Sequence, residues 1–83
     1  MKKVNNPKLE GILNDVGLPY FIMAVSHLLD VGYRSMTEES VKETIEKIKA
    51  KEENPRAFMT NDFMAFIVET AYKISQAART QKV

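Results

Sequence analysis

The single histidine, His27, is the first residue to consider for chemistry, because Ser26 precedes it and Asp30 follows three positions later. A serine, a histidine and a carboxylate form a nucleophilic triad when each lies within hydrogen-bond reach of the next. In a helix, however, Ser26 and His27 point about 100° apart. His27 and Asp30 share one helix face, but two ligands are fewer than the three or four that a zinc site needs. We therefore expect neither a triad nor a metal site here.

The remaining groups with chemical potential are carboxylates and glycines. Glutamates are concentrated between residues 38 and 53, where they alternate with lysines in the manner of a solvated helix face. The three glycines are isolated from one another, so they do not form a phosphate-binding loop. The chain contains no cysteine, which excludes disulfides, thiolate metal ligands and cysteine nucleophiles. We expect a protein that is not an enzyme and that needs no metal and no cofactor.

The length and composition of the chain predict its general class. It has 83 residues, of which 45% are hydrophobic, and a formal net charge of +1. These values are typical of one small soluble domain, which we place over residues 1–83. No apolar stretch reaches the roughly 20 residues of a membrane-spanning helix, and Glu10 and Asp15 lie where a signal peptide would be basic. We therefore expect a cytoplasmic protein that does not enter a membrane.

The first half of the chain carries clear helix boundaries. Asn6 is a good N-cap, the proline that follows it suits a first helical turn, and Gly17 suits the left-handed residue after a helix. Pro19 and Gly32 repeat this arrangement. These signals predict two consecutive helices.

Two further helices are predicted in the second half. Thr37 is a candidate N-cap for the third, with a capping box formed by Ser35 and Glu38 as the alternative. An Asn-Pro pair then breaks the chain, and Thr60 or Asn61 caps the fourth helix. The predicted helices cover residues 7–16, 19–31, 38–52 and 61–78, and we expect frayed ends at residues 1–5 and 79–83.

The distribution of apolar residues predicts how the helices pack. The second and fourth helices are apolar around half or more of their circumference, whereas the first and third carry narrow stripes. We therefore expect an all-α, compact four-helix domain in which helices 2 and 4 are central, helices 1 and 3 flank them, and helix 2 is largely buried. Because the loops are short, consecutive helices should pack as neighbours.

The narrow stripes leave apolar surface uncovered on the central helices. A contiguous exposed apolar patch is typical of an interaction site, and methionine and aromatic residues are enriched there. The candidate protein-binding residues are Met23, Phe58, Met59, Phe66 and Tyr72. The alternative interpretation is that these side chains complete the core of a monomer.

These observations favour a small regulatory or inhibitory module that acts by binding another protein or by forming a homodimer, and an accessory protein of a mobile genetic element is one protein of this kind that we consider. The alternative is a small helical DNA-binding protein that uses the third helix, with Arg34, Lys42 and Lys49 as the nucleic-acid-binding residues. The glutamates in the first half of that helix weaken the alternative, because phosphates repel them.

Overall fold

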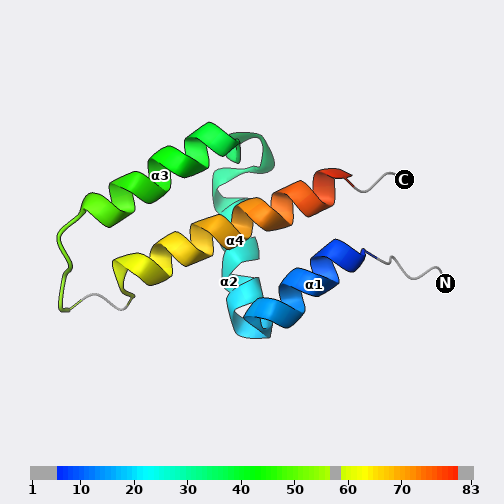
Figure 1. Ribbon diagram of the computed structural model, residues 1–83, viewed down its shortest axis with the longest axis horizontal. Helices are drawn as coiled ribbons and strands as arrows, with labels where there is room; N and C mark the ends of the chain where they lie inside the picture. The colour runs from blue at the N-terminus through cyan, green and yellow to red at the C-terminus, as the bar shows by residue number, and fades with distance from the viewer. Residues whose placement is uncertain (1–5, 57–58, 81–83) are drawn as a thin grey trace.

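The chain folds into four α-helices, as Figure 1 shows for the computed structural model, which describes residues 6–56 and 59–80. The helices are α1 (Pro7–Val16), α2 (Leu18–Val31), α3 (Glu38–Ala50) and α4 (Asn61–Thr80), with a 3-10 turn, η1 (Tyr33–Ser35), after α2. These bounds confirm the predicted helices to within two residues at each end. Arg79 and Thr80 belong to α4, so the fraying predicted from residue 79 is wrong at these two positions. The other predicted frayed residues lie outside the described part of the chain.

Three of the helix starts are fixed by side chains that accept backbone hydrogen bonds. The Oδ1 atom of Asn6 accepts from the amides of Lys8 and Leu9, at 3.1 and 3.2 Å. Thr37 caps α3 in a capping box with Ser40, rather than the alternative box that begins at residue 35. At the start of α4, the Thr60 hydroxyl accepts from the amide at position 63, at 3.1 Å. Each bond pairs an amide that the helix itself leaves without a partner.

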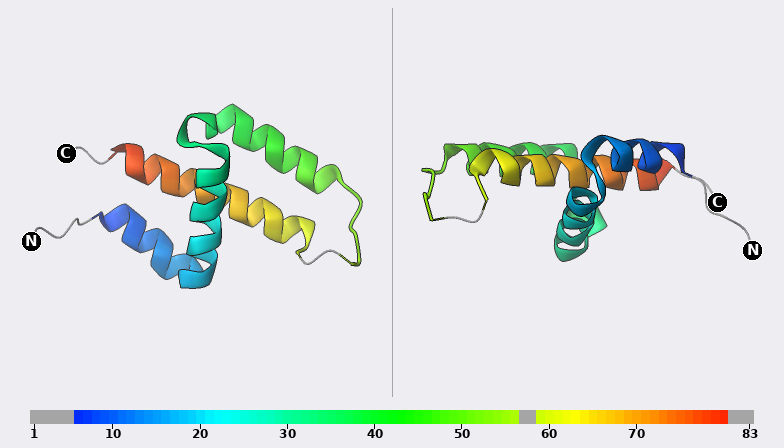
Figure 2. Two further views of the ribbon diagram at one scale, coloured as in Figure 1. Left: turned by 180° about the vertical axis from the view of Figure 1, so that it is seen from behind. Right: turned by 90° about the horizontal axis from the view of Figure 1, so that it is seen from below.

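The helices form two layers. α1, α3 and α4 lie roughly in one layer, with α4 between the other two, and α2 crosses α4 on one face of that layer (Figure 2). α2 and α4 share the most extensive contact, and α1 and α3 flank α4, as predicted. The core therefore lies between α4 and its three neighbours, and its fully or nearly buried residues are Ala24, Leu28, Met36, Val41, Ile67, Val68, Ala71 and Ile74.

The prediction that α2 is largely buried is wrong. Only Ala24 and Leu28 of this helix are buried, and both lie near its middle or just beyond it. Because α2 crosses α4 steeply (Figure 1), the two helices touch over a short length and the remainder of α2 extends past α4. A helix that crosses another at a steep angle cannot bury a long apolar face against it.

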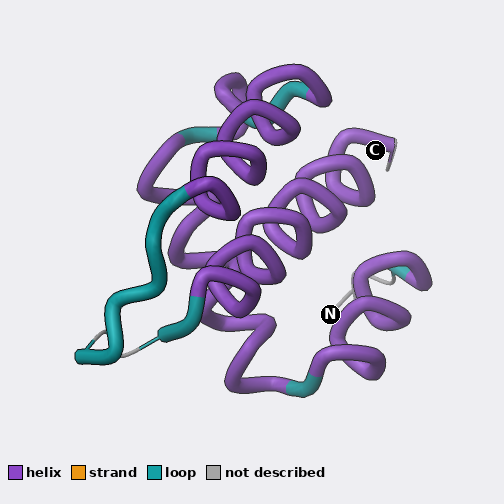
Figure 3. Tube along the Cα trace, turned by 60° about the vertical axis from the view of Figure 1, so that its left-hand side comes forward, coloured by secondary structure: helices purple, strands orange, loops and turns teal. Residues whose placement is uncertain are grey.

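The prediction that consecutive helices pack as neighbours holds only in part. α3 lies alongside α4, and Figure 3 shows the two running side by side. α3 makes little contact with α2, although only η1 and three further residues separate them. α3 therefore covers one side of α4 and leaves the outer face of α2 free.

The turns on either side of α2 depend on glycine. Gly17 has φ 88° and ψ 155°, and Gly32 has φ 87° and ψ 147°. Positive φ with ψ near 150° is a backbone region that is almost exclusive to glycine, and it differs from the left-handed helical conformation that the sequence predicted. The chain bends by 118° between α1 and α2. Gly17 thus sets the direction in which α2 leaves the layer.

None of the helices in the described residues is long and apolar enough to cross a membrane by itself. α1 and α2 reach the required length and apolar content only when they are taken together, across the bend of 118°.

Replacement of glycine by alanine should change the free energy of unfolding in opposite directions at the two turns and inside α1. Gly17→Ala or Gly32→Ala should lower the free energy of unfolding by about 1–3 kcal/mol, since alanine is strained at positive φ. Gly11 is an ordinary helical residue with open space around its Cα, so Gly11→Ala should raise the free energy of unfolding by about 1 kcal/mol. Urea denaturation followed by circular dichroism measures both changes, and equal effects at all three positions would contradict the account of the turns.

Substitutions of Asn6 should lower stability to different degrees. Its Nδ2 atom also donates to the carbonyl oxygen of Ala77 at 3.3 Å, and this bond links the start of α1 to the end of α4. Asn6→Ser keeps a capping oxygen but is too short for this link, whereas Asn6→Ala loses both. We expect the alanine variant to lose about 1–2 kcal/mol of stability and the serine variant to lose less. Equal losses in thermal unfolding would show that the cap contributes nothing.

Candidate protein-binding surface

The largest exposed apolar side chains of α2 lie along one line of the helix. Leu18 is 59% exposed, Ile22 is 53% exposed and Leu29 is 69% exposed. Val25 lies between them and is partly buried against the core. The successive spacings of four, three and four residues place these side chains within an arc of about 60° on the helix surface. We call Leu18, Ile22, Val25 and Leu29 the α2 stripe.

The exposed apolar surface is concentrated on this part of the molecule. A single large exposed hydrophobic residue is ordinary on a protein surface. Among the described residues, however, every large hydrophobic side chain that is exposed lies in α2 or at the following turn, with the exception of Phe66 in α4. These α2 and turn residues are Leu18, Tyr20, Ile22, Leu29, Val31 and Tyr33. The location points to α2 as the candidate binding element.

Phe66 belongs to an aromatic cluster at the other side of α2. The ring centroid of Tyr20 lies 5.3 Å from that of Phe63 and 6.5 Å from that of Phe66, both in edge-to-face arrangements. The two phenylalanine rings are stacked with their centroids 6.2 Å apart. These contacts hold the first turns of α2 and α4 together. Phe66 therefore contributes to packing although it is 39% exposed.

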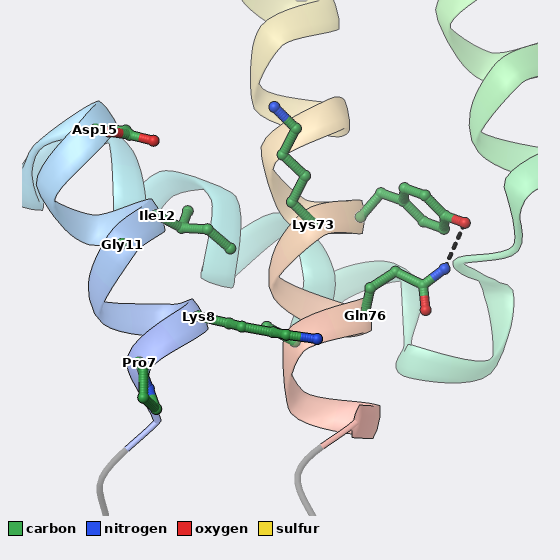
Figure 4. Close-up of a pocket in the computed structure, with 9 residues that line it drawn as sticks. Pro7, Lys8, Gly11, Ile12, Asp15, Lys73 and Gln76 are labelled. Carbon is green, nitrogen blue, oxygen red and sulfur yellow. Dashed lines mark hydrogen bonds between the residues drawn. The ribbon is translucent and has the colours of Figure 1, made fainter.

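A groove of about 430 Å³ lies between α1 and α4. Figure 4 shows Ile12 of α1 directed into the groove and Lys8 reaching toward Gln76 of α4. Gln76 donates a hydrogen bond to the hydroxyl of Tyr72 at 2.5 Å. Lys73 forms an exposed ion pair with Glu69, at 3.6 Å, and Asp15 also lines the groove, so its rim carries charges of both signs. This mixture selects no particular ligand.

The five predicted protein-binding residues do not lie on the α2 stripe. Met23 and Tyr72 are partly buried against the core, and Tyr72 lines the groove between α1 and α4. Met59 is partly buried in a separate hollow that it shares with His27. Phe66 is the exposed member of the set, and Phe58 lies outside the described residues. Leu18, Ile22 and Leu29 are absent from the predicted set, although their helical spacing is a usable signal in the sequence.

The residues considered for chemistry are not arranged as a reactive site. Ser26 and Asp30 are exposed, and His27 is partly buried beside the hollow that contains Met59. No hydrogen bond or ion pair joins these three side chains within the described part of the chain. Across residues 6–56 and 59–80, no group of three or more histidine, aspartate and glutamate side chains is placed to hold a metal ion.

The predicted nucleic-acid-binding residues are all on the surface. Arg34 lies in η1, and Lys42 and Lys49 lie on α3, where the seven-residue spacing places them on one face. Glu38 and Glu46 are exposed four residues before and after Lys42. The face is therefore mixed in charge, and its net attraction for phosphates is weakened.

Comparison of the chain with protein-family models, curated proteins and solved structures found no significant match. We therefore infer the function from the arrangement of the residues themselves. In that arrangement, the α2 stripe contains three of the exposed large hydrophobic side chains of the described residues.

Substitution of two adjacent leucines tests which face of α2 is buried and which is exposed. Leu28 is 1% exposed, whereas Leu29 is 69% exposed. Leu28→Ala should lower the free energy of unfolding by about 2–5 kcal/mol, because it leaves a cavity in the core. Leu29→Ala should change it by less than about 0.5 kcal/mol in dilute solution. The two free energies come from chemical denaturation, and a large loss at Leu29 would contradict the placement of the stripe.

Proposed function

We propose that this protein is a small, non-enzymatic regulatory or inhibitory module that acts by binding another protein chain, and that the α2 stripe is the contact surface. The observation that carries the proposal is the exposure of Leu18, Ile22 and Leu29 along one line of a helix. Three side chains in a row differ from scattered surface leucines, because a partner can cover all of them at once.

The hydrophobic effect supplies a reason for association. Covering apolar surface contributes roughly 25 cal/mol for each Å² removed from water, which amounts to about 1.5–3 kcal/mol for a leucine that passes from exposed to buried. The α2 stripe leaves more than half of Leu18, Ile22 and Leu29 in water. Association with a complementary apolar surface would recover part of this free energy.

The position of α2 supports access by a partner. α2 lies in a layer of its own, and its exposed face is not covered by α1, α3 or α4 in the described residues (Figure 2). A partner helix with an apolar face fits such a surface, as in the recognition of amphipathic helices. The formal net charge of +1 gives no strong long-range field, so the affinity should depend little on salt.

A photocrosslinking experiment tests the proposal. A benzophenone amino acid at Ile22, in the protein expressed in the cells that naturally produce it, should form a discrete adduct under ultraviolet light. The matched control carries the same group at Glu43, an exposed position on α3. The adduct at Ile22 should disappear when Leu18 and Leu29 are both replaced by serine, because the stripe would then lose its apolar surface.

Two outcomes would contradict the proposed function. One is the absence of any adduct at Ile22, and the other is an adduct that persists in the serine double variant. Binding of duplex DNA that weakens steeply with salt, and that is lost on replacing Lys42 and Lys49, would support the DNA-binding alternative instead.

A further inference from the structure

We propose that the partner seated on the α2 stripe is α2 of a second copy of this chain, packed antiparallel about a twofold axis. This inference rests on the proposed function, since it names the occupant of the same surface.

The spacing of the stripe suits a helix of the same kind. Apolar residues that alternate at intervals of four and three are those that pack between neighbouring helices in coiled coils and helical bundles. From Leu18 to Leu29 the stripe extends for about 16 Å, which is three helical turns. In an antiparallel pair centred between Ile22 and Val25, Leu18 faces Leu29 of the second copy, and Ile22 faces Val25 of the second copy. The stripe is thus complementary to itself, as a twofold interface requires.

The charges of α2 allow two copies to approach. α2 contains one histidine, His27, and one acidic residue, Asp30, and it contains no lysine, arginine or glutamate. The helical spacing places neither His27 nor Asp30 on the stripe. Pairing therefore brings no like charges together at the centre of the contact and buries no unpaired charge. An antiparallel arrangement also places the positive end of one helix beside the negative end of the other, which is the favourable orientation of two helix dipoles.

The size of the surface sets the expected strength. The stripe and its rim offer roughly a few hundred Å² of apolar surface. In a standard stable interface each partner contributes more, about 800 Å². We therefore expect a dimer that dissociates in the micromolar range. The projection of α2 from the other three helices, seen in Figure 2, concentrates this contact on α2.

Sedimentation velocity at increasing protein concentration measures the self-association. The weight-average mass should rise from that of the 9.5 kDa monomer toward twice that value. Ile22→Glu should keep the protein monomeric at all concentrations, because it places two carboxylates close together in the pair. Asn14→Glu adds the same charge at an exposed position on α1 and should leave the association unchanged.

Cysteine substitutions test the antiparallel geometry, and the absence of native cysteine makes every crosslink assignable. Leu18→Cys and Leu29→Cys proteins should each form little disulfide with themselves under mild air oxidation. A mixture of the two should form a crosslinked dimer, since residue 18 of one copy faces residue 29 of the other. Efficient crosslinking of each variant with itself would overturn the antiparallel pairing.

Different experimental results would overturn the dimer and the proposed function. A wild-type protein that remains monomeric at high concentration would overturn the dimer. If the benzophenone at Ile22 then forms an adduct with a different protein, and the serine double variant abolishes it, the binding function stands while the second copy is excluded as its occupant.

Discussion

The crossing of α2 over α4 is the contact on which the remainder of the structure depends. Ala24 of α2 and Ala71 of α4 are fully buried in the same cluster as Leu28, which is 1% exposed. Small side chains at a crossing allow two helix backbones to approach, and a neighbouring leucine then fills the space beside them. This contact decides which face of α2 is inside, and therefore which face is left in water.

The exposed stripe follows from the limited size of the chain. α1 contacts α2 and α4 to a similar extent and α3 lies mainly against α4, so in the described residues no helix covers the outer face of α2. Gly17 directs α2 out of the layer, and Gly32 returns the chain toward α3 through η1. The most apolar helix is thus held by its buried central residues and by the aromatic contacts of its first turn, while Leu18, Ile22 and Leu29 face solvent. The same geometry that stabilises the fold creates the candidate binding surface.

The helices could be predicted from the sequence because their boundaries are encoded locally. Asn6, Thr37 and the two turn glycines act on backbone groups within a few residues, so their effect is visible in the sequence. The burial of α2 was predicted incorrectly because α2 is apolar around much of its circumference. The angle at which it meets α4 depends on contacts between residues about 45 positions apart, which no local pattern reveals.

The candidate site was missed for the same reason. Met23 and Tyr72 were selected for their residue types, but both lie partly against the core, whereas Leu18, Ile22 and Leu29 of the α2 stripe are more than half exposed. Residue type alone does not distinguish a core leucine from a surface leucine. Leu28 and Leu29, which are adjacent in the sequence and opposite in exposure, illustrate the point.

Methyl-resolved NMR with a soluble paramagnetic probe tests the central claim most directly, because it reports the exposure of each methyl group. At low protein concentration, the methyl signals of Leu18, Ile22 and Leu29 should broaden strongly, while those of Leu28 remain sharp. At high concentration, Leu18, Ile22 and Leu29 should become protected, without a change at Leu28. Protection of Leu18 and Leu29 equal to that of Leu28 at low concentration, or exposure that never changes with concentration, would contradict the account.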